Sequence, residues 1–408
     1  MKTEVVGLKF ALRLTRDEEA RFVAFAGARR HIYNWGLERR MAHYRQTQTT
    51  LSFKQQCREL TLYKQRPENS WLGEVHSQVP QQALRDLNRA FQNFFAGRAR
   101  FPRFQSAKRD PLRFRIPQSI RVKHDRLFVP KLGWVRLRKS REIEGLVKSA
   151  RFQCSASGRW FVSLTVHRKV AEPTLAPVAW ETTEGADLGL THLVTLSDGT
   201  RIVPSRSYLR AARKLARLGR ELSRKKPGSR NRAKAKRRLA RHHERVANHR
   251  HHHHHTLTHR LTCVYDTLGT ETLSVRGLAR TKLAKAIHDA SWGELARQLE
   301  YKAERRGKHL VRADRFFPST RRCSVCHSLT GPSGPDELSI RAWYCPVCRT
   351  EHDRDENAAA NLKFVAFLVA AGLAETQNAC GETVRPWHLR AHLDEAGTRI
   401  PTPAAKAA

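Results

Sequence analysis

The sequence contains no apolar segment long enough to cross a membrane, and it is poor in acidic residues. No run approaches the ~20 apolar residues of a membrane-spanning helix, and the first residues do not resemble a signal peptide. We therefore expect no membrane partner. The 408 residues hold 37 Asp and Glu against 77 Lys and Arg, a formal net charge of +40. Such an excess repels itself unless a polyanion neutralises it, so nucleic acid is the expected partner.

Cysteine is also scarce, with eight residues in the whole chain, which excludes a disulfide scaffold. Four of them form two C-x-x-C pairs separated by 18 residues, Cys323 with Cys326 and Cys345 with Cys348. This spacing is typical of a zinc ribbon, in which each pair supplies two sulfurs to one tetrahedral ion, so we expect one structural zinc. The remaining cysteines are scattered and are expected to be ordinary, partly buried side chains: Cys57, Cys154, Cys263 and Cys380.

The N-terminal part of the chain shows strand and helix signals in turn. Residues 5–14 alternate apolar and polar side chains, which predicts a strand, and Thr15 with Glu18 forms the capping box of a helix that follows. Further helical periodicity predicts that residues 16–99 form a helical insert after this strand. Short strand patterns then occupy residues 100–178, and we expect a small β-barrel that the first strand completes.

The C-terminal part combines predicted strands with long helices. Strands are predicted at 186–190, 192–196 and 264–271, and a helical pair at 210–245 carries 16 basic residues against two acidic ones. This imbalance favours a surface that contacts successive phosphates of a nucleic-acid backbone. Its candidate nucleic-acid contacts are Arg232, Lys234, Lys236, Arg237 and Arg238. Residues 251–255 are consecutive histidines in a helical context; they point in different directions and are not expected to share one metal ion.

Three acidic residues stand where a metal site is expected. Asp187 lies in an apolar strand, Glu271 ends another strand, and Asp355 opens a helix just after the second cysteine pair. Each has a plain structural interpretation by itself: a residue near a turn, a surface charge, or a residue favoured in a first helical turn. Together they predict a site for two magnesium ions, since magnesium prefers hard oxygen ligands and an ion pair catalyses phosphodiester hydrolysis.

Three segments around these acids resemble the RuvC-type motifs of a known family. Residues 186–190, 269–273 and 353–361 are similar to the motifs of TnpB proteins, the RNA-guided DNA endonucleases of insertion sequences, which are related to type V CRISPR effectors. The resemblance covers roughly residues 5–370. It extends to four shorter motifs: Tyr33-Asn34, Phe101-Pro102-Arg103-Phe104, Ser291-Trp292-Gly293-Glu294 and Phe317-Pro318-Ser319-Thr320.

The resemblance implies a multidomain α+β and α/β fold. A wedge β-barrel with a helical recognition insert is expected to precede a RuvC-like nuclease domain of the RNase H fold, into which a zinc ribbon is inserted. The expected order is a first barrel strand at 1–15, the helical insert at 16–99, the barrel at 100–178, the nuclease domain at 179–317, the zinc ribbon at 318–350, the last nuclease part at 351–370 and a flexible tail at 371–408.

The same resemblance implies the function of individual residues. Asp187, Glu271 and Asp355 are expected to be the catalytic acids that bind two Mg²⁺ ions, with Asp187 bridging both ions and Asp353 supporting. A guide RNA from the transposon end and double-stranded target DNA are the implied partners, and the protein is expected in the prokaryotic cytoplasm, associated with the nucleoid. The sequence leaves the oligomeric state open, with a monomer favoured. Cleavage should occur beside a short flanking motif, which residues of the helical insert and of the 113–118 loop should read; the candidates in the insert are Phe53, Ser77 and Gln81.

Three other functions are compatible with parts of this pattern. The acids of an RNase H-like fold could serve a transposase that joins DNA strands. An RNA-guided DNA-binding repressor on a silent nuclease would be favoured by loss of an acid, but all three are present. An RNA-binding zinc-ribbon protein without catalysis would leave the acids unexplained.

Overall fold

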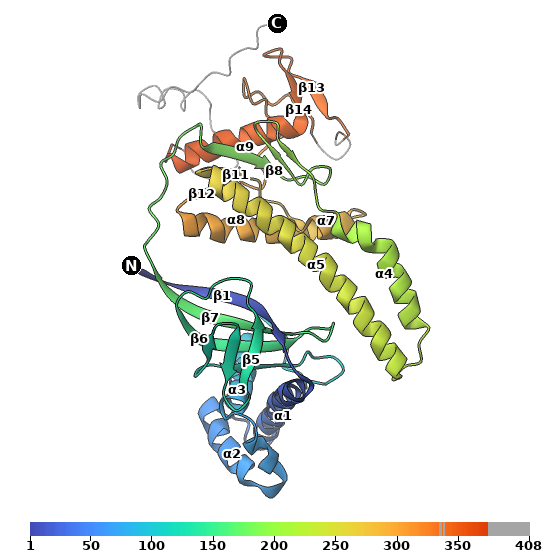
Figure 1. Ribbon diagram of the computed structural model, residues 1–408. Coiled ribbons are helices and arrows are strands. Elements are labelled where there is room, and N and C mark those ends of the chain that lie inside the picture. The colour runs from blue at the N-terminus through green and yellow to red at the C-terminus, as the bar shows by residue number, and fades with distance from the viewer. Residues whose placement is uncertain (334–336, 338, 374–408) are drawn as a thin grey trace. The chain divides into compact units, whose positions relative to one another are not determined.

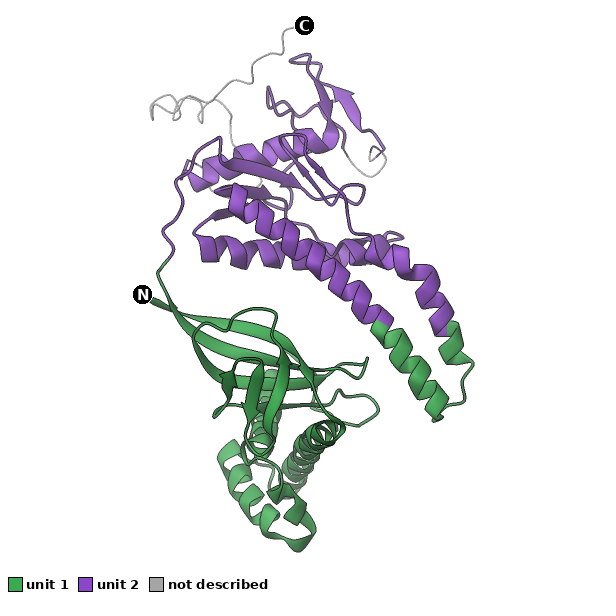
Figure 2. Cartoon of the chain, in the orientation of Figure 1, with its two compact units in different colours: residues 1–172, 220–241 green, residues 173–219, 242–408 purple. Residues whose placement is uncertain are grey.

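The structure is a computed structural model that describes residues 1–333, 337 and 339–373 (Figure 1). The chain divides into two compact units, one of residues 1–172 and 220–241 and the other of residues 173–219 and 242–408 (Figure 2). Cys380 and nearly all of the tail predicted at 371–408 lie outside the described residues. None of the described helices is long and apolar enough to cross a membrane.

Unit 1 is built on one antiparallel sheet of seven strands in the order β2-β6-β7-β1-β5-β4-β3. The strands are β1 (Lys2–Arg13), β2 (Arg113–Ile116), β3 (Arg121–Lys123), β4 (Arg126–Val129), β5 (Gly133–Arg138), β6 (Leu146–Cys154) and β7 (Trp160–Val170). The first strand lies between β7 and β5, which confirms that it completes the later sheet. Among the described residues the edge strands β2 and β3 do not pair, so the predicted barrel stays a prediction. The 113–118 segment, expected to be a loop, is mostly strand β2.

The helices of unit 1 follow β1 directly, as predicted. They are α1 (Arg16–Thr47), α2 (Phe53–Gln65), the 3-10 helix η1 (Pro67–Gly73) and α3 (Gln78–Phe95). Thr15 caps α1 through the capping box with Glu18, because each side chain accepts a hydrogen bond from the other's backbone N–H. Phe22 of α1 is fully buried and meets Phe114 and Phe152 edge-on, with ring centroids 5.4 Å apart. These aromatic contacts attach the helices to the sheet.

Unit 2 contains a mixed five-stranded sheet in the order β10-β9-β8-β11-β12. Its strands are β8 (Thr183–Asp187), β9 (Val194–Leu196), β10 (Arg201–Ile202), β11 (Thr267–Thr270) and β12 (His309–Arg312), with β8, β11 and β12 parallel. The strand predicted at 264–271 is shorter in the structure, where β11 spans only Thr267–Thr270, because helix α5 continues to Val264. A separate hairpin of β13 (Ala342–Tyr344) and β14 (Glu351–Asp353) carries the second cysteine pair in its turn.

The other helices are α4 (Ser207–Ser223), α5 (Arg230–Val264), α6 (Val275–Leu278), α7 (Ala284–Ala290), α8 (Trp292–Arg306) and α9 (Arg354–Ala370). Helix α5 includes the five histidines, as predicted, and only His254 among them is fully buried. Helix α9 lies directly against β8 and β11 (Figure 1). Two glycines permit this approach: a Cβ atom at Gly185 would stand 1.8 Å from the Ala359 carbonyl oxygen, and one at Gly269 would stand 2.3 Å from that of Leu362.

Replacing Gly185 with Ala should therefore push α9 off the sheet and destabilise the protein by about 3 kcal/mol. The added methyl group would meet helix backbone rather than a side chain that can move aside. Urea unfolding of the purified variant measures the change. Gly293→Ala is the matched control, since a Cβ atom there would meet nothing within 4 Å. Equal unfolding midpoints for the two variants would contradict this account of the packing.

Candidate metal centres

Three acidic side chains of unit 2 extend from parts of the backbone that lie close together. Asp187 is the last residue of β8, and Glu271 directly follows β11. The parallel strands pair Gly185 with Gly269, so both acids emerge at the same edge of the sheet. The backbone N–H of Leu188 donates a hydrogen bond to Glu271 Oε1 at 3.3 Å, which links the two strand ends. Asp355 joins them from the first turn of α9.

The three carboxylates lie close enough for their charges to act on one another. All three side chains are half-buried. Burial raises the pKa of Asp187 well above its usual value, and the negative charges of Glu271 and Asp355 raise it further. Burial also raises the pKa of Glu271 to about 7. A cluster of carboxylates that disfavours its own ionisation is stabilised by a divalent cation, so the donor set fits magnesium.

Two arginines bind the carboxylate of Asp355. Arg354 Nη2 lies 2.9 Å from its Oδ1, and Arg341 Nη1 lies 3.0 Å from its Oδ2. The neighbouring Asp353 instead caps α9, and its Oδ1 accepts hydrogen bonds from the backbone N–H groups of Asp355 and Glu356 at 3.0 and 3.1 Å. Its other oxygen pairs with Arg201 at 2.9 Å. Asp353 thus shapes the start of the helix that presents Asp355.

The four cysteines of the two C-x-x-C pairs form a compact sulfur cluster. Their Sγ atoms all lie within 4.8 Å of one another, and Cys323 and Cys345 are buried. The separations are 3.5 Å between Cys323 and Cys348 and 3.6 Å between Cys326 and Cys345. A tetrahedral zinc with bonds near 2.3 Å requires sulfurs about 3.8 Å apart, so these residues fit one zinc ion. Within the described part of the chain, no second group of His, Cys, Asp or Glu side chains brings its ligand atoms together in this way.

Two asparagines join the zinc site to helix α9. The side-chain amides of Asn357 and Asn361 donate hydrogen bonds to the carbonyl oxygen of Arg322 at 2.8 and 2.6 Å. The Ser324 N–H donates in return to Asn357 Oδ1 at 2.8 Å. Both asparagines are almost completely buried. They hold the first cysteine pair against the helix that carries Asp355.

The predicted nucleic-acid contacts lie in unit 1 on several elements. Phe53 is half-buried at the start of α2, and Ser77 and Gln81 are exposed at the start of α3. In the basic helical pair, Lys234, Lys236, Arg237 and Arg238 are exposed. Arg232 differs, because its Nη1 donates hydrogen bonds to the carbonyl oxygens of Leu222 and Lys225 and so fixes the turn between α4 and α5.

The sequence did not single out Arg341 or Arg354. Arg354 lies between the two aspartates of the 353–361 motif, so its position in that motif could have identified it. Arg341 stands 14 residues before Asp355, in no recognisable pattern, and only the β13–β14 hairpin brings the two together.

Sequence comparison relates the chain to three family models. The model "Probable transposase" matches residues 166–282, a "Cas12f1-like, TNB domain" matches 292–362, and a "Helix-turn-helix domain" matches 6–49. In the structure the last segment is a strand followed by one continuous helix, α1.

Two curated relatives match over almost their whole length. A Streptomyces pristinaespiralis protein provisionally named RNA-guided DNA endonuclease is 38% identical, covering 93% of this chain and 91% of the relative. The Escherichia coli K12 protein InsQ, with the same provisional name, is 34% identical and covers 92% and 94%. Among solved structures, a Cas12f1–sgRNA–target DNA complex matches with a TM-score of 0.55 and 11% identity, covering 86% of this chain and 83% of that one. The last match concerns the fold alone.

Replacing Glu271 with Gln should stabilise the folded protein at pH 8 and not at pH 4. Folding raises the pKa of Glu271 from 4.5 to about 7, so the folded state binds the proton more tightly. Stability is therefore lost as the pH rises from 4.5 to 7, and the variant should regain roughly 1–3 kcal/mol above that window. Urea unfolding at both pH values without added divalent cations measures this gain. The exposed Glu351 on β14, replaced with Gln, is the control; an equal gain for Glu271→Gln at both pH values would contradict the assignment.

Proposed function

The chain belongs to the TnpB family of RNA-guided DNA endonucleases, and we propose that it cuts DNA at sites selected by a bound guide RNA. Family membership rests on relatives that are more than 30% identical across nine tenths of the chain. The observation that supports catalysis is the convergence of Asp187, Glu271 and Asp355 at one edge of the unit 2 sheet. A protein that had kept only its binding function would have no need to maintain three mutually repelling acids.

We propose that these three acids hold a pair of magnesium ions. Magnesium supplies an activated water and stabilises the leaving oxygen of the phosphodiester. The carboxylates of the three acids are the hard oxygen ligands that magnesium prefers. The protein's own part is orientation: Leu188 N–H holds Glu271, and Arg354 and the cap at Asp353 hold Asp355.

The proposed partners are a guide RNA transcribed from the transposon end and double-stranded target DNA. The net charge of +40 supports strong polyanion binding. We assign contacts with phosphates to the exposed Lys234, Lys236, Arg237 and Arg238, and reading of the flanking motif to Phe53, Ser77 and Gln81. The protein is proposed to act as a monomer at the nucleoid. Pairing with the guide supplies sequence recognition, so the protein itself reads only the short flank.

A strand-transfer transposase is the competing function, since one matching family model carries that description. Both functions use acids of the same type, but a transposase requires a second DNA end as the acceptor and no guide. Dependence of cutting on RNA therefore separates them.

Replacing Asp187, Glu271 or Asp355 with Ala should each reduce guided cleavage by at least about a thousandfold, and double variants should lose no more, because the acids act as one unit. The assay is magnesium-dependent cleavage of a plasmid that carries the target beside a randomised flank, by protein loaded with matched, mismatched or no guide. Glu351→Gln, an exposed acid outside the centre, should cut normally.

Guide RNA retention by the same variants, measured after purification, should be unchanged, because the basic surfaces remain. Equal cutting with matched, mismatched and absent guide would reject the RNA-guided function. An Asp355→Ala protein that still cuts would reject the catalytic assignment alone.

A further inference from the structure

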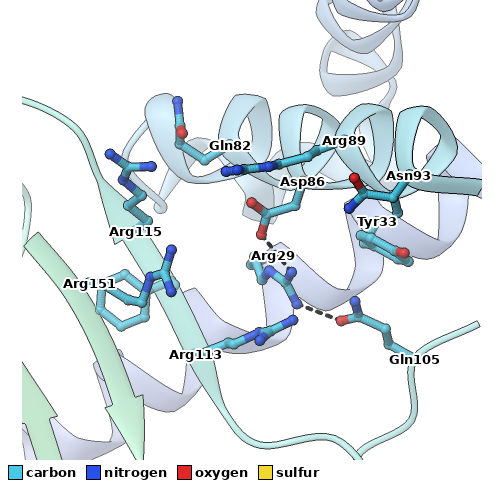
Figure 3. Close-up of a pocket in the computed structure, with 12 residues that line it drawn as sticks. Arg29, Tyr33, Gln82, Asp86, Arg89, Asn93, Gln105, Arg113, Arg115 and Arg151 are labelled. Atoms are coloured by element: carbon cyan, nitrogen blue, oxygen red, sulfur yellow. Dashed lines mark hydrogen bonds and ion pairs between the residues drawn. The ribbon is translucent and has the colours of Figure 1, made fainter. Parts of the chain in front are cut away.

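Unit 1 contains a cavity of about 290 Å³ with an unusual concentration of arginine (Figure 3). It is bounded by α1, α3, the segment at Gln105, and strands β2 and β6. Five arginines line it against a single acid: Arg29, Arg89, Arg113, Arg115, Arg151 and Asp86. Amides of Gln82 and Asn93 complete its polar wall. Neither the catalytic acids nor the basic helical pair contributes to this cavity.

The one carboxylate in the cavity is already engaged. Asp86 Oδ2 lies 2.7 Å from Arg29 Nη2, and Arg29 Nη1 donates to Gln105 Oε1 at 2.5 Å, as Figure 3 shows. Arg29 is only 4% exposed, so this pair is part of the folded core. No other acid among the described residues lines the cavity, so a single carboxylate faces five guanidinium groups.

The remaining arginines repel one another. Arg115 on β2 and Arg151 on β6 are direct cross-strand partners, an arrangement of like charges that destabilises a sheet. Arg115 donates a hydrogen bond to the uncharged Ser149 Oγ at 3.3 Å. Loss of hydration and the positive charges of Arg29 and Arg151 lower the pKa of Arg113, while the negative charges of Asp86 and Asp110 oppose the shift. An anion bound in this cavity offsets the repulsion between the arginines and so stabilises the folded protein.

We propose that this cavity binds the phosphodiester backbone of a nucleic acid, with Arg113, Arg115 and Arg151 as its phosphate ligands. The assignment rests on the proposed function for the identity of the polyanion. A guanidinium group donates two parallel hydrogen bonds to the oxygens of one phosphate group, and the neutral amides provide donors for an adjoining sugar or base.

The test compares Arg151→Gln with Arg126→Gln. Arg126 is also an exposed arginine directly opposite another arginine, Arg136 of β5, but Asp125 pairs with Arg136 at 2.9 Å. Removing Arg151 should weaken nucleic-acid binding several-fold and lower the slope of log affinity against log salt by about one. The same change should raise the melting temperature of the nucleic-acid-free protein by about 1–2 °C, because it relieves repulsion. The Arg126 variant should change neither quantity.

The probes are a labelled single-stranded RNA and a labelled DNA duplex of equal length, each titrated at several salt concentrations. A loss confined to RNA assigns the cavity to the guide, and a loss confined to DNA assigns it to the target. Unchanged affinity and slope with both probes overturn the proposal. Arg115→Gln is the second variant and should behave as Arg151→Gln does. Guided cleavage by the wild-type protein, measured in parallel, separates failure of this proposal from failure of the proposed function.

An independent observation concerns the zinc ribbon. Arg341 reaches both carboxylate oxygens of Asp355, with its Nη1 3.2 Å from Oδ1 and 3.0 Å from Oδ2. It belongs to the ribbon segment, immediately before β13. Its carbonyl oxygen accepts a hydrogen bond from the Arg354 N–H at 2.7 Å, and the next residue, Ala342, pairs with Asp353 of β14. Cys345 and Cys348 lie in the turn of this hairpin, so zinc binding there fixes strand β13, which directly follows Arg341.

We infer that Arg341 is a positioning residue of the nuclease centre, supplied by the zinc ribbon. Its guanidinium orients the Asp355 carboxylate and places a fixed positive charge beside it, which opposes binding of a divalent cation to that carboxylate. The inference rests on the proposed function. It gives the ribbon a direct part in the centre, beyond supporting helix α9.

Arg341→Gln should make Mn²⁺ bind several-fold more tightly, because one positive charge beside the acids is lost, while cleavage turnover at saturating metal falls about tenfold or more. Mn²⁺ affinity is measured by calorimetry, independently of activity. Arg341→Lys should restore Mn²⁺ affinity to the wild-type value, since it keeps the charge. Arg321→Gln, an exposed arginine of the same ribbon, is the matched control and should leave both quantities unchanged.

Zinc content, measured for every variant, should stay at one ion per chain. Unchanged Mn²⁺ affinity and turnover in Arg341→Gln overturn the inference. Loss of zinc together with activity also overturns it, because Arg341 would then be a structural residue of the ribbon. If wild-type protein shows no guided cleavage at all, the proposed function fails instead, and the Mn²⁺ titration still reports on the charge at Asp355.

Discussion

The arrangement of unit 2 depends on how closely helix α9 approaches the parallel strands β8 and β11. Gly185 and Gly269 leave no side chain between the sheet and the helix backbone. The helix therefore starts at the edge of the sheet where Asp187 and Glu271 emerge, and its first turn brings Asp355 to them. The same helix holds the first cysteine pair through Asn357 and Asn361. One packing contact thus connects the carboxylate cluster and the zinc site.

The molecule contains two electrostatic imbalances of opposite sign. The chain as a whole carries a large positive excess, whereas three acids crowd into one edge of a sheet. Each imbalance is unfavourable for folding alone, because like charges at close range raise the free energy of the compact state. Each would be relieved by the proposed partner of opposite charge, a polyanion for the arginines and divalent cations for the acids. Repulsion between like charges lowers the stability of the folded protein at both places, as expected if each place binds a partner of opposite charge.

Local patterns in the sequence predicted local structure well. The capping box at Thr15 and Glu18 fixed the start of α1, and the spacing of the cysteines predicted a cluster that the structure contains. The acids were identified by their motifs, and the fold brings them together as expected, though their catalytic role stays a proposal. Boundaries between unlike elements were harder: Val264 has strand-like neighbours and is exposed, but it ends α5, whose preceding turns pack into the core through Leu257 and Leu261.

Other features depend on which strands pair and in which register. Arg115 and Arg151 are 36 residues apart, and only the β2–β6 register makes them neighbours. Arg341 meets Asp355 only because the β13–β14 hairpin folds back onto the start of α9. Pair contacts of this kind leave no periodic signal in a single sequence, so residue type alone did not reveal them.

Reprogramming of the guide tests the central claim most directly. Protein of unchanged sequence is loaded with two RNAs that differ only in the guide segment, and each complex is offered both matching targets beside the same flank. The account predicts that each complex cuts only the target that its guide matches, and that mismatches nearest the flank are the most damaging, because pairing begins there. Cutting of the same target by both complexes would contradict it.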